Sequence, residues 1–258
     1  MIDQLQRLLF RVDPIPLESP RGYFCRVASA HGYDSPQWLV NLAGFSGPSA
    51  ALDPENHVRP LAHVLRLEPE EWWAMSYRPV KGTGRFAQRA FYGRTVRGDQ
   101  FNYRRPRICP QCLRERPVWW AVWDLGLVAA CPFHCCLLVN QCPAYGKKLV
   151  WRRPAVERCR CGSDSRTATA EAANADLVAM NALIYRAAGF SLGAAVELQL
   201  AAYHFPPELG RLALGPLLRL IRFVEFIGER IGCEGNNALF PGPTSARQSR
   251  QVKQPQPH

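Results

Sequence analysis

The sequence predicts a mainly α-helical protein with a small β ribbon at its centre. Three observations support this fold class. Apolar residues recur at helical spacing both before residue 77 and after residue 166, as they do in amphipathic helices. Between these regions, cysteines and a histidine fall in closely spaced pairs within residues 109–161. The length of 258 residues suits one large domain or a few small modules.

The first set of paired residues has the arrangement of metal ligands. Cys109-Pro-Gln-Cys112 and Cys131-Pro-Phe-His134 are two short turns separated by eighteen residues, so four ligands can meet at one tetrahedral ion. Zn²⁺ favours this mixture of thiolate and imidazole, and a closed shell leaves no position for a substrate. The sequence therefore predicts one zinc ion bound by Cys109, Cys112, Cys131 and His134. The alternative, a set of buried free cysteines, does not explain the paired turns.

The second set of cysteines is incomplete. Cys142, Cys159 and Cys161 supply three ligands, but the position expected for the fourth holds Tyr145, a poor zinc ligand. Two alternatives stay open: a second zinc ion, or a metal-free half of the ribbon that packing holds together. Cys135 or Cys136 would complete the set only by breaking the geometry of the turns. These two, with Cys25 and Cys233, are expected to be small buried side chains without a nucleophilic role.

Residues 1–77 are predicted to form an N-terminal helical module. After an irregular arm over residues 1–18, Ser19 and Pro20 have the composition of a helix start, with Ser19 as the N-cap. Gly32 is the expected end of this helix. Two later helical segments of the module are expected at about residues 59–67 and 68–76.

A second helix should start at Ser35-Pro36, so that the first two helices resemble a helix-turn-helix. Its expected apolar face comprises Trp38, Leu39, Leu42 and Phe45. A helix that reads DNA carries side chains that reach base edges, and the second helix offers only Gln37 and Asn41. We therefore expect this module to dock a protein rather than to read bases.

Residues 78–107 are predicted to be a basic linker. Asp99 is its one acidic residue, and aromatic residues lie between the cations, a composition that suits contact with nucleic acid through phosphates and stacking. The cations expected to make this contact are Arg78, Lys81, Arg85, Arg89, Arg94, Arg97, Arg104 and Arg105. The net charge of +11 and the pI near 9.4 also favour a polyanionic partner. The alternative is a solvated loop whose aromatic side chains pack on the metal module.

The remaining chain divides into three parts. The paired ribbon spans residues 108–165, with a strand expected at 118–123 whose tryptophans form its small core. Residues 166–240 should form a helical module, and residues 241–258 a disordered tail rich in proline, glutamine and serine. The expected helices cover about residues 170–188, 194–200 and 206–231. Gly215-Pro216 should break the last of these in two.

Together, these residues resemble the TniQ family. The similarity rests on Arg107-Ile-Cys109-Pro-Gln-Cys112, Cys131-Pro-Phe-His134, Cys142-Pro-x-x-Gly146, Cys159-Arg-Cys161-Gly162 and the N-terminal Pro-Leu-Glu-Ser19. It implies an N-terminal helix-turn-helix, a paired zinc ribbon and a helical C-terminal module. The resemblance assigns Cys109, Cys112, Cys131 and His134 to one zinc and Cys142, Cys159 and Cys161 to a second. The family pattern has cysteine where this chain has Tyr145.

The resemblance also implies a function. TniQ proteins, similar to TnsD, select targets for transposons without cutting or joining DNA. They link a target-recognition element, in some systems a CRISPR effector with its guide RNA, to the AAA+ regulator (TnsC-like) that recruits the transposase. The expected partners are therefore this regulator, DNA and, in such systems, the effector. A homodimer stays open.

Other classes of function have weaker support. The sequence has no Gly-x-x-x-x-Gly-Lys-[Ser/Thr] loop and no His-Glu-x-x-His motif, so we expect no enzyme. The main alternative is a sequence-specific, zinc-containing transcriptional regulator. The sequence contains no run of about eighteen apolar residues, so we expect no membrane span. The first residues lack the apolar core of a secretion signal. Cysteines used for metal then indicate a reducing cytoplasm.

Overall fold

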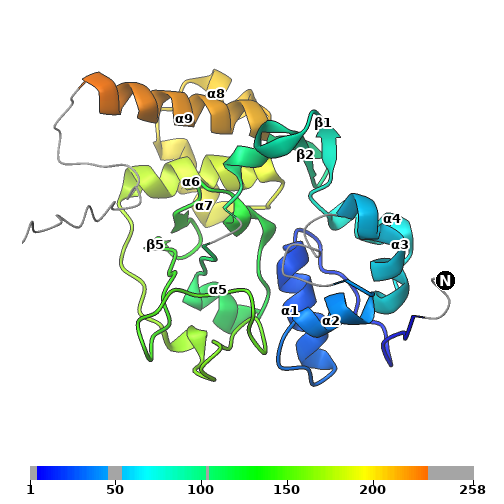
Figure 1. The fold of residues 1–258 in the computed structure, drawn as a ribbon. Coiled ribbons are helices and arrows are strands. Elements are labelled where there is room, and N and C mark those ends of the chain that lie inside the picture. The colour runs from blue at the N-terminus through cyan, green and yellow to red at the C-terminus, as the bar shows by residue number, and fades with distance from the viewer. Residues whose placement is uncertain (1–4, 46–53, 103–104, 232–258) are drawn as a thin grey trace, which may run out of the picture.

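The structure, a computed structural model, describes residues 5–45, 54–102 and 105–231. It is mostly helical with small antiparallel sheets, as the sequence predicts (Figure 1). In Figure 1, helices α1–α4 lie to the right of the central ribbon, and α6–α9 lie above it. The α-helices in these ranges are α1 (Pro20–Ala30), α2 (Gln37–Leu42), α3 (Pro54–Leu65), α4 (Pro69–Met75), α5 (Pro110–Glu115), α6 (Ala175–Ala188), α7 (Gly193–Ala202), α8 (Pro207–Arg211) and α9 (Leu214–Ile231).

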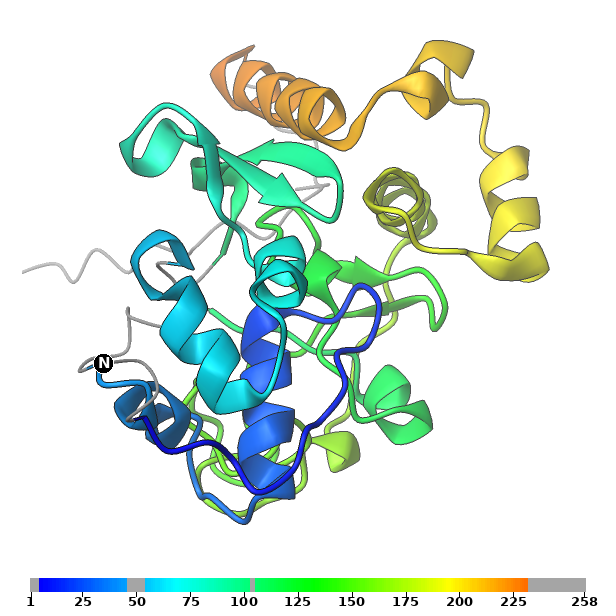
Figure 2. The same cartoon turned by 90° about the vertical axis from the view of Figure 1, so that its right-hand side faces the viewer.

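A three-stranded sheet, which the sequence analysis did not anticipate, occupies much of residues 78–107. Its order is β1 (Pro79–Lys81), β2 (Gln88–Phe91) and β3 (Arg94–Arg97). Tyr92 and Gly93 join β2 to β3 and both have positive φ, 46° and 78°, as the tight turn of a two-residue hairpin requires. Strand β3 contacts α9, and both views place the sheet between α4 and α9 (Figures 1 and 2).

Helix α1 begins and ends where the sequence predicts, but Ser19 does not cap it. Pro20 is in the first turn, and Gly32 follows the helix with a φ of 74°. The Ser19 side chain makes no capping hydrogen bond. Instead its hydroxyl donates to the buried carboxylate of Asp124 at 2.6 Å. Ser19 thus occupies the expected N-cap position, but its hydroxyl is directed to Asp124 and makes no bond to a helix N–H.

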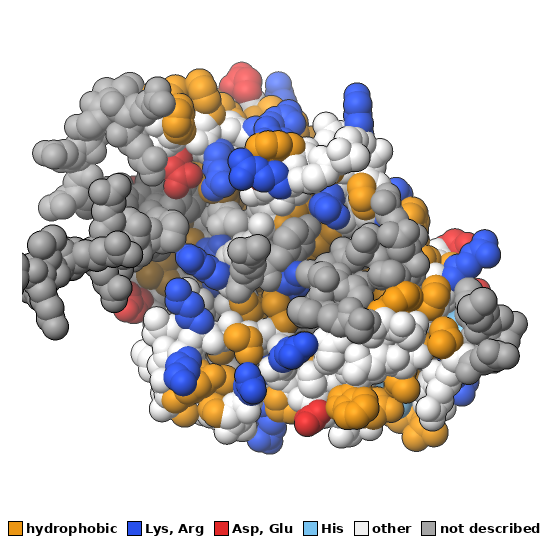
Figure 3. Space-filling model, in the orientation of Figure 1, with side chains coloured by type: hydrophobic (Ala, Val, Ile, Leu, Met, Phe, Trp, Pro, Cys, Tyr) orange, Lys and Arg blue, Asp and Glu red, His pale blue; other side chains and the backbone are white. Residues whose placement is uncertain are grey.

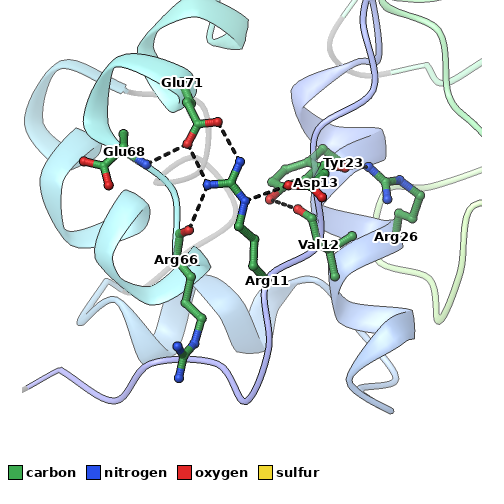
Figure 4. Close-up of polar contacts among 8 residues, drawn as sticks. All are labelled: Arg11, Val12, Asp13, Tyr23, Arg26, Arg66, Glu68 and Glu71. Carbon is green, nitrogen blue, oxygen red and sulfur yellow. Dashed lines mark hydrogen bonds and ion pairs between the residues drawn. The ribbon is translucent and has the colours of Figure 1, made fainter.

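The N-terminal arm is irregular, as expected, and ion pairs hold it against α4. The guanidinium of Arg11 makes two hydrogen bonds to Glu71, at 2.7 and 2.9 Å, and a third to Asp13 at 2.7 Å (Figure 4). Glu71 also accepts from the backbone N–H of Glu68, which closes the capping box of α4. The arm is therefore part of the helical module.

Two large clusters of buried side chains, with a small third one around Ala129, Ala130 and Leu177, form the core of the described residues. The smaller of the two large clusters lies within the N-terminal module and includes Tyr23, Leu39, Leu65 and Trp72. The larger one joins the ribbon cysteines to the tryptophans and to helices α6 and α9. The expected face of α2 is partly wrong, because Trp38 is 51% exposed and Val40, at 3%, is buried instead.

The strand expected at residues 118–123 is wrong. Residues Ala121–Asp124 form a 3-10 turn, η5, and only Trp120 in this stretch makes a β bridge, with Glu18. The strands of the ribbon are instead β4 (Ala130–Cys131) and β5 (Cys136–Leu137), which pair antiparallel. The tryptophans do form core: Trp119 and Trp123 are fully buried.

The C-terminal helices are present, and their expected break is misplaced. The chain leaves α8 after Arg211, and Gly215-Pro216 lies within the first turn of α9, where proline removes no helical hydrogen bond. A side chain at Gly215 has no space, because its Cβ would lie 2.4 Å from the carbonyl oxygen of Thr95 on β3. Helix α9 is buried on one face, with Leu214, Leu217, Leu218 and Ile221, whereas Val224 is 59% exposed.

Some predictions fall outside the described residues: Arg104, Cys233 and the tail at 241–258. The division into modules at residues 77, 107, 165 and 240 stays a prediction. Among the helices of the described ranges, none combines the length and the apolar character that a membrane crossing needs.

Candidate metal centres and basic surface

The first predicted ligand set comes together in the ribbon. The two turns lie on different elements: Cys109 precedes α5 and Cys112 lies within it, whereas Cys131 ends β4 and His134 follows in the turn to β5. The ligand atoms of all four side chains lie within 4.8 Å of one another. The three cysteines are buried, and they belong to the larger core.

The spacing of these atoms matches a tetrahedral zinc site. Zinc–sulfur and zinc–nitrogen bonds of usual length place two sulfurs roughly 3.8 Å apart and a sulfur and a nitrogen roughly 3.6 Å apart. His134 Nδ1 lies 3.3 to 3.4 Å from the sulfurs of Cys109, Cys112 and Cys131. The sulfurs of Cys112 and Cys131 are 3.5 Å apart. The four side chains could therefore hold one ion after a small expansion.

Glu115 orients the histidine, a role that the sequence analysis missed. With Nδ1 directed at the thiols, the opposite ring nitrogen of His134, Nε2, donates to Glu115 Oε1 at 2.8 Å. Carboxylates commonly hold metal-binding histidines in this way and select the tautomer. The signal was present in the sequence, because Glu115 follows Cys112 by three residues and so shares its face of α5.

The fold also places the thiol of Cys136 beside the first ligand set. Cys136 lies 3.7 Å from Cys109 and 3.4 Å from the side-chain oxygen of Gln111. The neighbouring thiols of Cys112, Cys131 and Cys136 hold the pKa of Cys109 far below its usual value. One thiolate is thus favoured before any ion binds, as a metal ligand requires.

The second predicted ligand set also comes together. Cys142, Cys159 and Cys161 have sulfurs within 4.8 Å of one another, and those of Cys142 and Cys161 are 3.6 Å apart. Burial raises the pKa of Cys142, but the Ser163 hydroxyl and the backbone amides of Tyr145 and Ala144 outweigh it and bring this pKa to about 7.

Several cations of the predicted nucleic-acid segment make contacts within the fold. Three arginines of the basic segment donate to backbone carbonyls: Arg89 to Tyr77, Arg107 to Gly126, and Arg94 to both Tyr92 and Ala187. Arg78 lies over the ring of Trp73. The sheet therefore uses much of the expected interface to hold its own fold.

The cations that remain outward lie at the tip of the sheet. Lys81 and Arg85 are exposed, and the guanidiniums of Arg85 and Arg97 lie 4.5 and 4.9 Å from the centre of the half-exposed Phe86 ring. Arg97 also pairs with Asp99. Arg105 is exposed beyond the sheet. On the face drawn in Figure 3, Lys and Arg side chains are more numerous than acidic ones.

Comparison with known proteins adds the family. The model of the TniQ family matches residues 9–138, which is 130 of the 258 residues. The match spans α1–α4, the sheet and the first ligand set, and it ends before Cys142. No curated protein matches the chain. The chain therefore belongs to the TniQ family, which implies a role in target selection for DNA transposition.

Proposed function

We propose that this protein is a non-enzymatic adaptor that selects targets in DNA transposition. It links a target-recognition element to the AAA+ regulator that recruits the transposase. In one form of such a system, the recognition element is a CRISPR effector with its guide RNA. The observation that carries the proposal is the TniQ match over both the N-terminal helices and the first ligand set.

In this proposal, zinc in the first site is structural. Cys109, Cys112, Cys131 and His134 supply a full tetrahedral shell, so a bound zinc would have no vacancy for a substrate. The ion would supply folding free energy, because it joins α5 to the β4–β5 hairpin. Use of cysteine for metal fits a reducing compartment, and we place the protein in the cytoplasm.

The N-terminal helices and the three-stranded sheet have separate tasks in this scheme. Helices α1 and α2 form a helix-turn-helix-like surface that docks a protein, and the sheet tip with Lys81, Arg85 and Arg97 contacts the DNA backbone without reading bases. Two weak contacts on one chain raise the effective concentration of the regulator at a chosen site.

A sequence-specific regulator is less well supported. Helix α2 has only six residues, and a recognition helix must place several side chains against base edges. Its two candidates for base contact, Gln37 and Asn41, hydrogen-bond to each other at 3.1 Å. Gln37 is also 3.4 Å from Arg152 of the ribbon.

The decisive experiment is size-exclusion chromatography of the full chain with the AAA+ regulator of its own transposon, with and without ATP and duplex DNA. We expect a complex that requires both. The same elution profile reports whether the protein alone is a monomer or a dimer. Failure to associate, together with a sharp sequence-specific footprint by this protein alone, would reject the adaptor in favour of the regulator.

A further inference from the structure

The second ligand set contains oxygen atoms as well as sulfur. The Ser163 hydroxyl lies 3.0 Å from the sulfur of Cys142 and 3.2 Å from that of Cys161. The phenol oxygen of Tyr145 lies 3.6 Å from the sulfur of Cys159. Three thiols and two hydroxyls thus meet where a complete site would have four ligands.

The backbone around these residues has the form of two metal-binding turns. In the first turn, the N–H of Gly146 donates to the carbonyl of Cys142 at 3.0 Å. In the second, the N–H of Gly162 donates to the carbonyl of Cys159 at 2.9 Å. Both glycines have positive φ, 68° and 86°, which other residues adopt at a cost. The shape of the site is therefore kept although one cysteine is missing.

Tyr145 is poorly placed to be the fourth ligand. Its phenol oxygen lies near only one of the three sulfurs, that of Cys159. The ring is 39% exposed, and the ammonium of Lys147 lies 5.7 Å from its centre. The phenol contacts Cys159, whereas the Ser163 hydroxyl lies between two of the three sulfurs.

We propose that the second site binds zinc through the thiolates of Cys142, Cys159 and Cys161 and the hydroxyl oxygen of Ser163. Each thiol gives up its proton when the ion binds, and the hydroxyl binds as a neutral group. Three thiolates and one neutral ligand give the zinc a net charge of −1, the same as three thiolates and an imidazole give in the first site. Lack of a fourth cysteine thus makes the charge of the second site match that of the first.

The oxygen ligand makes the second ion easier to remove than the first. A hydroxyl is a weaker donor to zinc than a thiolate or an imidazole, and Cys161 is exposed, so a chelator can reach this site. The chain then carries two ions of different lability: one joins α5 to β4–β5, and the other closes the loops around residues 142–163.

Cobalt substitution of the full-length protein tests the proposal. Co²⁺ reports the number of sulfur ligands through its sulfur-to-metal charge-transfer absorption. We expect two ions per chain, with three sulfurs bound to each. Ser163→Ala should weaken the binding of the second ion by about tenfold or more. Ser163→Cys should tighten it and add the absorption of one further thiolate.

Tyr145→Phe is the matched control, because it removes the phenol oxygen but keeps the ring. We expect it to leave the affinity for the second ion unchanged. Binding of the first ion shows in each variant that the chain is folded. Loss of the second ion in Tyr145→Phe with retention in Ser163→Ala would make the phenol the ligand and overturn the proposal. Binding of a single ion by the unmodified chain, or an unchanged second site in Ser163→Ala, would overturn it as well.

Discussion

The carboxylate of Glu115 is expected to matter for metal binding although it does not belong to the ligand set. It accepts the Nε2–H of His134 at 2.8 Å and so keeps Nδ1 directed at the three thiols. Loss of such a partner usually lowers metal affinity by about 10- to 100-fold. We expect Glu115→Ala to lower zinc affinity at the first site within this range, measured by competition with a chromophoric chelator. Glu208→Ala, on α8 and away from both clusters, should have no effect; equal losses in the two variants would remove the orienting role from Glu115.

Asp124 should make stability depend on pH in the direction opposite to that of an ordinary salt-bridged carboxylate. Burial raises its pKa from 3.8 to about 6, and hydrogen bonds from Ser19 and Tyr77 only partly oppose this. The folded protein therefore holds a proton that the unfolded chain releases as the pH rises from about 4 to about 6. Over this window Asp124 is expected to lower the free energy of unfolding, by up to roughly 3 kcal/mol.

The Asp124→Asn variant isolates this effect. Urea unfolding of both proteins should be measured between about pH 4.5 and about pH 7. As the pH rises, the free energy of unfolding of the wild type should fall relative to that of the variant, and the difference should then level off. Protonation of the zinc ligands affects both proteins alike, so it cancels in the comparison. A difference independent of pH would mean that Asp124 has the same protonation state in the folded and unfolded chain.

At this scale the sequence predicts ligands better than it predicts their neighbours. The clustering of Cys109, Cys112, Cys131 and His134 was predictable because the two candidate ligands of each turn are close in sequence, and local spacing is enough to place them. Ser163 was missed because only the fold brings a hydroxyl from a second turn beside Cys142. Serine is also too common in loops for its sequence position to mark it as a ligand.

At the scale of elements, Arg94 joins the hairpin of β2 and β3 to the end of α6. Its guanidinium donates to the carbonyl oxygens of Tyr92 and Ala187, and Gly189 gives it space, since a Cβ there would come within 2.7 Å of it. Arg94→Ala should leave two part-buried carbonyls without this donor and cost about 1–3 kcal/mol in the free energy of unfolding. Arg85→Ala, at the exposed tip, should cost less than about 0.5 kcal/mol.

Loss of Arg85 at the tip should weaken DNA binding more than loss of Arg94, the reverse of their effects on stability. Removal of Lys81 and Arg85 together should weaken binding to duplexes of any sequence and reduce the salt dependence of the binding constant by about one unit per lost phosphate contact. Fluorescence anisotropy at several salt concentrations measures both quantities. If Arg94→Ala, kept folded at low temperature, lost more affinity than the Lys81/Arg85 pair, the tip would not be the contact surface.

The helices were more predictable than the strands for a physical reason. Helix α6 has fourteen residues, most of them buried, so its apolar stretch is long enough to indicate a helix in the sequence. Strands β1–β3 have three or four residues each, and each mixes polar or charged residues with apolar ones. Two or three such positions do not establish a period of two, so the net charge of the segment dominated its interpretation as a linker.

At the scale of the whole molecule, the zinc sites and the N-terminal module belong to different cores that meet at one seam. Backbone hydrogen bonds join Ser19 to Trp119 and Ala121 to Leu17, at 2.7 and 2.9 Å. Gly22 allows the close approach, because a Cβ there would lie 2.4 Å from the Cβ of Trp119. The seam therefore positions the two parts of the molecule, while each part has its own buried cluster.

Loss of metal should thus unfold one part of the protein before the other. The larger core contains the proposed ligands Cys109, Cys112 and Cys131 together with side chains of α6 and α9, and the binding energy of a structural zinc is largely folding energy. Cys112→Ser, or removal of zinc with a chelator, should release amide protection across residues 108–161 and then across α6–α9, measured by hydrogen exchange.

Helices α1–α4 should keep most of their protection, since their core contains none of these ligands. Cys135→Ser, which changes a thiol outside both ligand sets, should retain metal and protection throughout. Uniform loss of protection in Cys112→Ser would show that the seam couples the two cores into one cooperative unit, whereas full protection without metal would show that packing alone holds the ribbon.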